Sequence, residues 1–219
     1  AASGMLMASF IFFFIFYMLD RRDRKLLMFA ILVLCLALRP FLSAPYLATI
    51  LDLRNWDMII RGEYLILFFM ITSGVWLAYL IYPTKWFRVF GMVTDLFFLA
   101  GVTVVVLLPV YLFTYTVFGI QAVALLAVLY AVAMSVRGVA AGNRKDVFYL
   151  VAFLAIIVGL VSDILLANAL EENQHLYILS FLMLVFVLIQ ATLLIADWVR
   201  RGKEREKLAV QVLELNRQL

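Results

Sequence analysis

The chain has 219 residues, of which 67% are hydrophobic and only 15% are charged. Soluble globular domains contain about 45–50% apolar and about 25% charged residues, and a soluble chain of this length could not bury so much apolar surface. A transmembrane helix needs about 20 apolar residues, so there is room for about seven. The composition excludes a soluble enzyme, a nucleic-acid module, a secreted disulfide scaffold and a disordered chain. It predicts a polytopic membrane protein.

Seven apolar segments, taken in chain order, predict an all-α bundle of membrane helices. They cover residues 4–19, 26–46, 63–82, 86–108, 117–136, 146–168 and 176–199. Residues 47–62 mix apolar side chains at helical spacing with charged ones, which favours an interfacial helix or a pair of helix extensions. The predicted domains are therefore a seven-helix bundle over residues 1–199 and a juxtamembrane segment over residues 200–219.

The start of the chain and its single cysteine add smaller expectations. The sequence starts at Ala1 and enters its first apolar segment without a basic stretch, so we expect no cleavable signal peptide and expect further sequence upstream. Cys35 is the single cysteine, which excludes an internal disulfide and a cysteine-based zinc site.

Most of the 18 Lys and Arg residues lie in alternate loops and in the C-terminal tail. These are Arg21, Arg22, Arg24, Lys25, Lys85, Arg88, Arg137, Arg144, Lys145, Arg200, Arg201, Lys203, Arg205, Lys207 and Arg217. The opposite loops hold only Arg54 and Arg61, among several acidic residues. Because basic loops stay in the cytoplasm, we expect the N-terminus outside and the C-terminus in the cytoplasm. This topology explains the pI of about 9.3 without a nucleic-acid partner.

The predicted spans offer little catalytic chemistry. A retinal pigment needs a lysine in the last span, and every lysine here lies in a loop or the tail. The one histidine, His175, cannot form a His-Glu-x-x-His zinc site. Asp95 and Asp163 lie at different depths and outside aspartyl-protease motifs. We therefore predict no catalytic residue, no metal, no cofactor and no enzymatic activity in this part of the chain.

Polar residues within the spans are costly in a bilayer and usually face a partner or a cavity. At about 1.5 Å per residue, Arg39, Glu63 and Asp163 fall in the outer half, and Asp95 and Gln190 share an inner depth. We predict an outer layer that is either a structural lock or a ligand or switch site, while Arg39 alone could also reach the outer headgroups. For Asp95 we favour an interhelical hydrogen bond over a role in a proton relay.

The tail combines a basic stretch with a weak heptad pattern. Residues 200–207 are rich in Lys and Arg, which suits anionic headgroups. The following apolar residues are spaced four, three and four apart, as in a coiled-coil seam: Leu208, Val212, Leu215 and Leu219. We expect a parallel coiled coil that makes a homodimer; a surface-lying amphipathic helix is the alternative.

Several local stretches resemble the bacterial seven-transmembrane receptors with diverse intracellular signalling modules. They are Asp20-Arg21-Arg22-Asp23-Arg24, Arg61-Gly62-Glu63-Tyr64-Leu65, Leu108-Pro109, Arg137 with Asn143-Arg144-Lys145-Asp146, and Gly159 with Asp163-Ile164-Leu165. The resemblance covers essentially the whole chain. It implies a transmission module in the bacterial inner membrane, with an extracellular sensor domain upstream and a cytoplasmic effector downstream.

The sequence thus predicts a receptor core that passes an extracytoplasmic signal through the seventh helix and a coiled coil. A small transporter or channel that uses Asp95, Asp163 and Arg39 along a path is the alternative from another class. Flux through proteoliposomes that is abolished by Asp163→Asn would favour that alternative.

Overall fold

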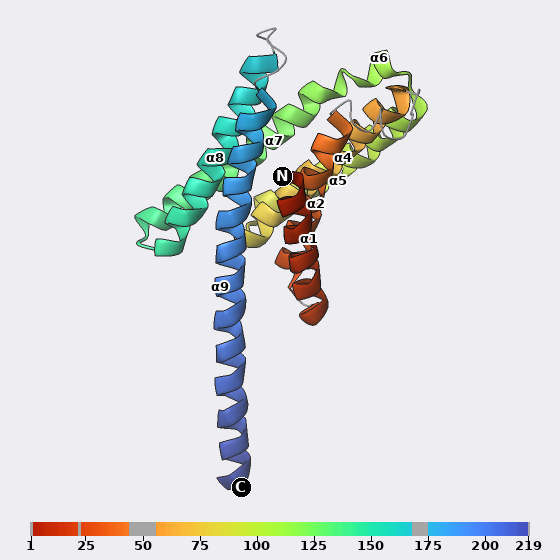
Figure 1. The fold of residues 1–219 in the computed structure, drawn as a ribbon. Coiled ribbons are helices and arrows are strands. Elements are labelled where there is room, and N and C mark those ends of the chain that lie inside the picture. Colours follow the sequence, from red (N-terminus) through yellow and green to blue (C-terminus); the bar gives the residue numbers. More distant parts are fainter. Residues whose placement is uncertain (1, 22, 44–55, 168–174, 219) are drawn as a thin grey trace.

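The structure of this protein is a computed structural model that describes residues 2–21, 23–43, 56–167 and 175–218. Within these ranges every regular element is a helix (Figure 1). The helices are α1 (Ala2–Leu19), α2 (Arg24–Ser43), α4 (Trp56–Ile81), α5 (Lys85–Leu107), α6 (Val110–Phe113), α7 (Thr116–Ala140), α8 (Arg144–Ala167) and α9 (His175–Gln218).

The long helices correspond to the predicted apolar segments in order, so the all-α prediction is confirmed for the described residues. Four of their stretches are long and apolar enough to cross a membrane: Asp57–Ile81, Lys85–Leu107, Val110–Ala140 and Leu182–Glu204. α4 begins at Trp56, seven residues before the predicted start at residue 63. The last part of the mixed stretch is therefore an extension of α4, and residues 47–55 lie outside the described residues.

Local chemistry sets the helix ends. Thr84 precedes α5, and its side-chain oxygen accepts a hydrogen bond from the backbone N–H of Phe87, which caps the helix. α5 ends at Leu107 because the next residue, Leu108, is extended before Pro109. After α7, Gly142 has a φ of 82°, a left-handed conformation that glycine adopts without a steric penalty.

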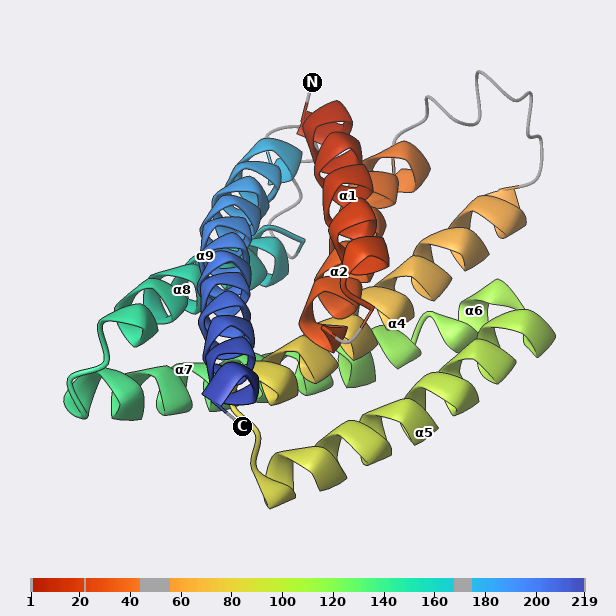
Figure 2. The same cartoon turned by 90° about the horizontal axis from the view of Figure 1, so that it is seen from below.

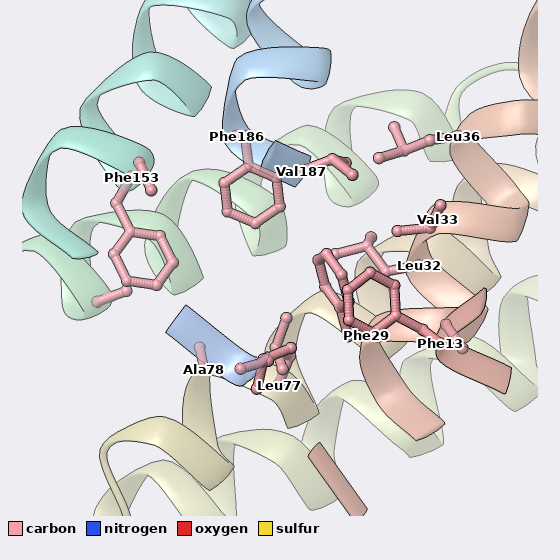
Figure 3. Packing of buried hydrophobic residues seen from close by; sticks show 14 of the residues in the cluster. Phe13, Phe29, Leu32, Val33, Leu36, Leu77, Ala78, Phe153, Phe186 and Val187 are labelled. Atoms are coloured by element: carbon pink, nitrogen blue, oxygen red, sulfur yellow. The ribbon is translucent and has the colours of Figure 1, made fainter. Parts of the chain in front are cut away.

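The hydrophobic core lies where α1, α2, α4, α8 and α9 meet (Figure 3). The rings of Phe13 and Phe29 pack edge to face with their centroids 4.8 Å apart, which joins α1 to α2. Phe153 and Phe186 join α8 to α9 in the same cluster. α5 lies at the edge of the molecule, beyond α4 (Figure 2), and its apolar outward side chains suit contact with lipid.

α9 is the longest helix, with 44 residues, and it extends well beyond the bundle (Figure 1). Phe186, Val187, Gln190 and Leu194 are buried and recur every three to four residues, so one face of α9 packs into the bundle. That face lies between α8 and the α1–α2 pair (Figure 2). Further along, Leu208 is 61% exposed. The same continuous helix is thus packed at one end and projecting at the other.

Candidate functional site

A cavity of about 270 Å³, here called the polar cavity, lies between α2, α4 and α7 with one residue from α9. Its polar lining residues are Arg39 from α2, Glu63 and Tyr64 from α4, and Gln121 from α7. Two residues of the predicted outer layer, Arg39 and Glu63, therefore line one cavity. Each of them has an interaction partner. The backbone of Asp163 lies in α8, but its side chain is outside the described residues, so this member of the layer is not placed.

Next to the polar cavity lies a second space of about 120 Å³, here called the apolar chamber. Its lining comes from α2, α4, α7, α8 and α9, and every lining residue is apolar or glycine. Four residues border both spaces: Met70, Ile71, Ala124 and Met183. The two spaces are therefore adjacent, with the charged groups at one end and hydrocarbon at the other.

The start of α4 is tied to α5 and α6 beside the polar cavity. The Arg61 Nε donates to Asp57 Oδ2 at 2.8 Å, and Arg61 Nη1 donates to the carbonyl oxygens of Val105 and of Val106, the latter at 3.1 Å. The ring of Tyr64 packs edge to face on Phe113, with centroids 5.1 Å apart. Arg61 was counted at the sequence level as a loop charge, and its role as a bridge between α4 and α5 was missed.

The structure does not join Asp95 and Gln190 through a hydrogen bond. Trp76 Nε1 donates to Asp95 Oδ1 at 2.9 Å, so this carboxylate links α5 to α4. Gln190 is fully buried in α9, and within the described residues neither atom of its side-chain amide has a hydrogen-bond partner. The sequence places Asp95 and Gln190 at one depth and favours an interhelical hydrogen bond for Asp95, and the bond to Trp76 is of that kind. Equal depth along two helices does not fix which way each side chain points.

A polar network, which sequence reasoning missed, holds the opposite end of the bundle, which includes the turns 82–84 and 141–143 and the start of α2. We call it the basic end. The Asp146 carboxylate, at the start of α8, accepts hydrogen bonds from Tyr82 Oη at 2.7 Å and from Asn143 Nδ2 at 2.7 Å. Ser135 lies 3.0 Å from the same Tyr82 oxygen. Asp146 is only 5% exposed, so these bonds stabilise a buried charge.

Two ion pairs attach α9 to this network. Lys145, at the start of α8, pairs with Asp197, and Arg201 pairs with Asp23, which precedes α2. The side chain of Asp23 is 5% exposed, whereas that of Arg201 is 38% exposed. Asp197 and Arg201 are four residues apart and so lie on the same face of α9. α9 is therefore fastened to both neighbours at the point where it leaves the bundle.

The environment of Tyr82 perturbs its ionisation. Burial and the hydrogen bond to Asp146 raise the pKa of the Tyr82 hydroxyl above its ordinary value, so it stays protonated as a donor at neutral pH. The sequence signal that could have found this network is the Asn143-x-x-Asp146 pattern at the start of α8, a form of capping box. The Lys145 N–H donates to Asn143 Oδ1 at 3.3 Å, as a cap requires.

Among the residues that the structure describes, no three His, Cys, Asp or Glu side chains gather as metal ligands would. The described residues form a cavity lined by charged groups at one end of the bundle and ion pairs that hold α9 at the other.

Comparison with known proteins agrees with a membrane domain of this kind. The comparisons with curated proteins and with solved structures give no match. The family model described as 7TM diverse intracellular signalling matches residues 1–197, which is most of the chain. The chain therefore belongs to the 7TM diverse intracellular signalling family, the family that its sequence resembles.

Proposed function

We propose that this chain is the membrane core of a bacterial receptor in the inner membrane, which passes a signal from outside the cytoplasm through α9 to a cytoplasmic effector. Seven spans with the basic end in the cytoplasm follow from the distribution of Lys and Arg. The polar cavity then faces the outer side. In this proposal a sensor domain precedes the core and an effector enzyme follows it, while the core itself has no enzymatic activity.

The observation that carries the proposal is the continuity of α9 from one end of the bundle to the other. Met183 of α9 lines the polar cavity, and Arg201 of the same helix pairs with Asp23 at the basic end. These residues are 18 positions apart, which is about 27 Å along a helix. A change of packing around Met183 can therefore reach Arg201 without any flexible joint.

The ion pairs at the basic end supply the element that can switch. The pairs of Lys145 with Asp197 and of Arg201 with Asp23 hold α9 in one position against α8 and α2. A signal that favours a second position of α9 must replace or break these pairs, which gives two discrete states instead of a gradual drift. Occupation of the polar cavity, or movement of the sensor domain, would shift the balance between them.

The output in this proposal is a parallel coiled coil between two copies of the chain. Its seam is Leu208, Val212, Leu215 and Leu219. Leu208 is largely exposed in the single chain, as a seam residue without its partner should be. The side chains of Val212 and Leu215, and the whole of Leu219, lie outside the described residues. The dimer therefore rests on the heptad spacing together with the continuity of α9.

The experiment is to join the chain after Leu215 to a cyclase or kinase reporter with zero to four alanines inserted. Each alanine rotates the reporter by about 100° relative to the bundle. Output that rises and falls with helical phase is the expected result. Equal output from every insertion would overturn transmission through a rigid helix. Insertion of four glycines, which interrupts the helix, is the control and should uncouple the reporter.

A further inference from the structure

We propose that the polar cavity and the apolar chamber together form one binding site for a small amphiphile, with a neutral hydrogen-bonding head group and a short alkyl tail. The claim that this ligand is the receptor's signal rests on the proposed function, but the binding itself does not. The two spaces are suited to such a ligand because they share a wall and differ completely in their chemistry.

The shared wall makes the two spaces one elongated site. Met70 and Ile71 from α4, Ala124 from α7 and Met183 from α9 border both. Two of the four are methionines, whose flexible thioether side chains adapt to a ligand more readily than branched ones do. A molecule longer than either space can thus lie across this wall with one end in each.

The head-group chemistry follows from the lining of the polar cavity. It contains one cation, Arg39, one anion, Glu63, and two neutral hydrogen-bonding groups, Tyr64 and Gln121. A head group with net charge would be attracted by one of the two ions and repelled by the other. A neutral amide or hydroxyl head group avoids this conflict and leaves the existing interactions of Arg39 and Glu63 in place.

Gln121 is the residue best placed to recognise such a head group. Its side chain is half-buried and lines the polar cavity, and within the described residues it makes no hydrogen bond. A side-chain amide offers two donors and an acceptor. An amide or hydroxyl on a ligand would satisfy these groups and so gain affinity from them.

The tail follows from the size and lining of the apolar chamber. Its volume of about 120 Å³ is slightly below the roughly 150 Å³ of a dry apolar cavity that accepts benzene. A tail of about four to six carbons fits a space of that order. Gly74 of α4 lines the chamber, and a Cβ atom built there would have no other atom within 4 Å. The space beside Gly74 is therefore open to a ligand.

Such a ligand would touch the transmitting helix directly. Met183 and Phe186 of α9 both line the chamber, and Phe186 belongs to the packed face of that helix (Figure 3). A tail in the chamber adds apolar contacts to α9 that the empty chamber lacks. Binding and the position of α9 are thereby coupled through contact and not through a distant pathway.

The test measures binding of N-acylethanolamines to the purified chain in lipid nanodiscs, at a fixed lipid ratio, with acyl chains of two, six and twelve carbons. Affinity should rise by about tenfold or more from two to six carbons, because several methylenes are buried. It should then level off or fall at twelve carbons. A continuous rise with chain length, as simple partition into lipid gives, would overturn the proposal. This series needs no variant.

Two variants locate the site. Gly74→Leu fills the apolar chamber and should weaken binding of the six-carbon probe by about tenfold, while leaving the two-carbon probe unchanged. Gln121→Leu should weaken both probes. Gly4→Leu is the matched control, because Gly4 is also a helical glycine with no atom within 4 Å of its Cβ position, and it should bind both probes as the unmodified chain does.

Unchanged binding of the six-carbon probe to Gly74→Leu would place the probe elsewhere and contradict the proposal. If Gly74→Leu does not fold, Ala127→Leu fills the chamber from α7 and serves in its place. Binding is measured without an effector, so a failure here leaves the phase experiment of the proposed function intact. Conversely, phase-independent output would overturn that function and leave the binding result standing.

Discussion

The polar cavity and the basic end both concentrate polar groups within an apolar bundle, yet they are built differently. Arg39, Glu63 and Gln121 line the polar cavity, which has a volume of about 270 Å³. At the basic end, Asp146 accepts bonds from two side chains, and Asp23 is buried against Arg201. Both regions keep space beside their polar groups, about 270 Å³ in the polar cavity and about 470 Å³ beside Asp146 and Asp197. The difference is that at the basic end charged groups from separate helices are joined directly in ion pairs.

This difference shows how similar residue types can serve opposite purposes in one membrane domain. Room beside polar groups lets a ligand enter and change the balance of contacts. Charges that are paired between helices fix a geometry, because a buried charge that loses its partner carries a large desolvation cost. We infer that the polar cavity receives the ligand and that the basic end holds α9 in position. α9 has residues in both regions.

The largest expected contrast comes from two glycines: Gly138 at the basic end, and Gly74 in the apolar chamber that adjoins the polar cavity. A Cβ on Gly138 would lie 1.9 Å from Asp146 Oδ2, whereas a Cβ on Gly74 would have no atom within 4 Å. Gly138→Ala should lower the free energy of unfolding by about 1–3 kcal/mol through overpacking. Gly74→Ala should raise it by up to about 1 kcal/mol through better helix propensity. Thermal unfolding in nanodiscs measures both, and equal effects would remove the contrast.

The next effect concerns the ion pair that fastens α9 to the start of α2. Arg201→Gln leaves the buried Asp23 carboxylate without its cation and should cost about 1–2 kcal/mol of unfolding free energy. Adding Asp23→Asn should recover part of that loss. Arg200→Gln is the matched control: its pair with Glu204 is exposed on both sides, so about 0.5 kcal/mol or less is expected. A loss of unfolding free energy in Arg200→Gln as large as that in Arg201→Gln would contradict a stabilising role for the pair of Arg201 with Asp23.

The smallest effect is a dependence on pH at the basic end. Since the pKa of Tyr82 is raised on folding, its contribution is complete below the unfolded value of about 10. That contribution is lost as the pH rises through the folded value, because the unfolded chain releases the proton first. Tyr82→Phe should therefore flatten the fall in stability above pH 10. Identical slopes for both proteins between pH 9 and 11 would refute this assignment.

Much of the fold could be predicted from the sequence, because long apolar segments have few alternatives to a helix. The charges at Asp57 and Arg61 left two interpretations of residues 47–62 open, an interfacial helix or a pair of helix extensions, and from Trp56 onward the stretch is an extension of α4. In the structure Asp57 and Arg61 pair with each other one turn apart, which lets the helix continue through them.

The sites were harder to predict than the helices. Charge sign and depth along the chain indicated Arg39 and Glu63, and both line one cavity. Depth also placed Asp95 and Gln190 in one inner layer and favoured an interhelical hydrogen bond for Asp95, but it could not name the partner, which is Trp76. The pairs of Asp23 with Arg201 and of Lys145 with Asp197 join residues 178 and 52 positions apart. Such contacts depend on how the helices pack, and hydropathy carries no information about that.

One measurement tests most directly whether the cavity and the basic end are coupled through α9. Spin labels are placed on exposed positions by Arg144→Cys and Arg200→Cys, after Cys35→Ala removes the native thiol. The distance between them is measured by pulsed electron resonance with the chamber open and with it filled by Gly74→Leu. A shift of about 1–2 Å is expected, as helix movements of this type give, and none in Gly4→Leu. An unchanged distance in a folded Gly74→Leu protein would contradict this coupling.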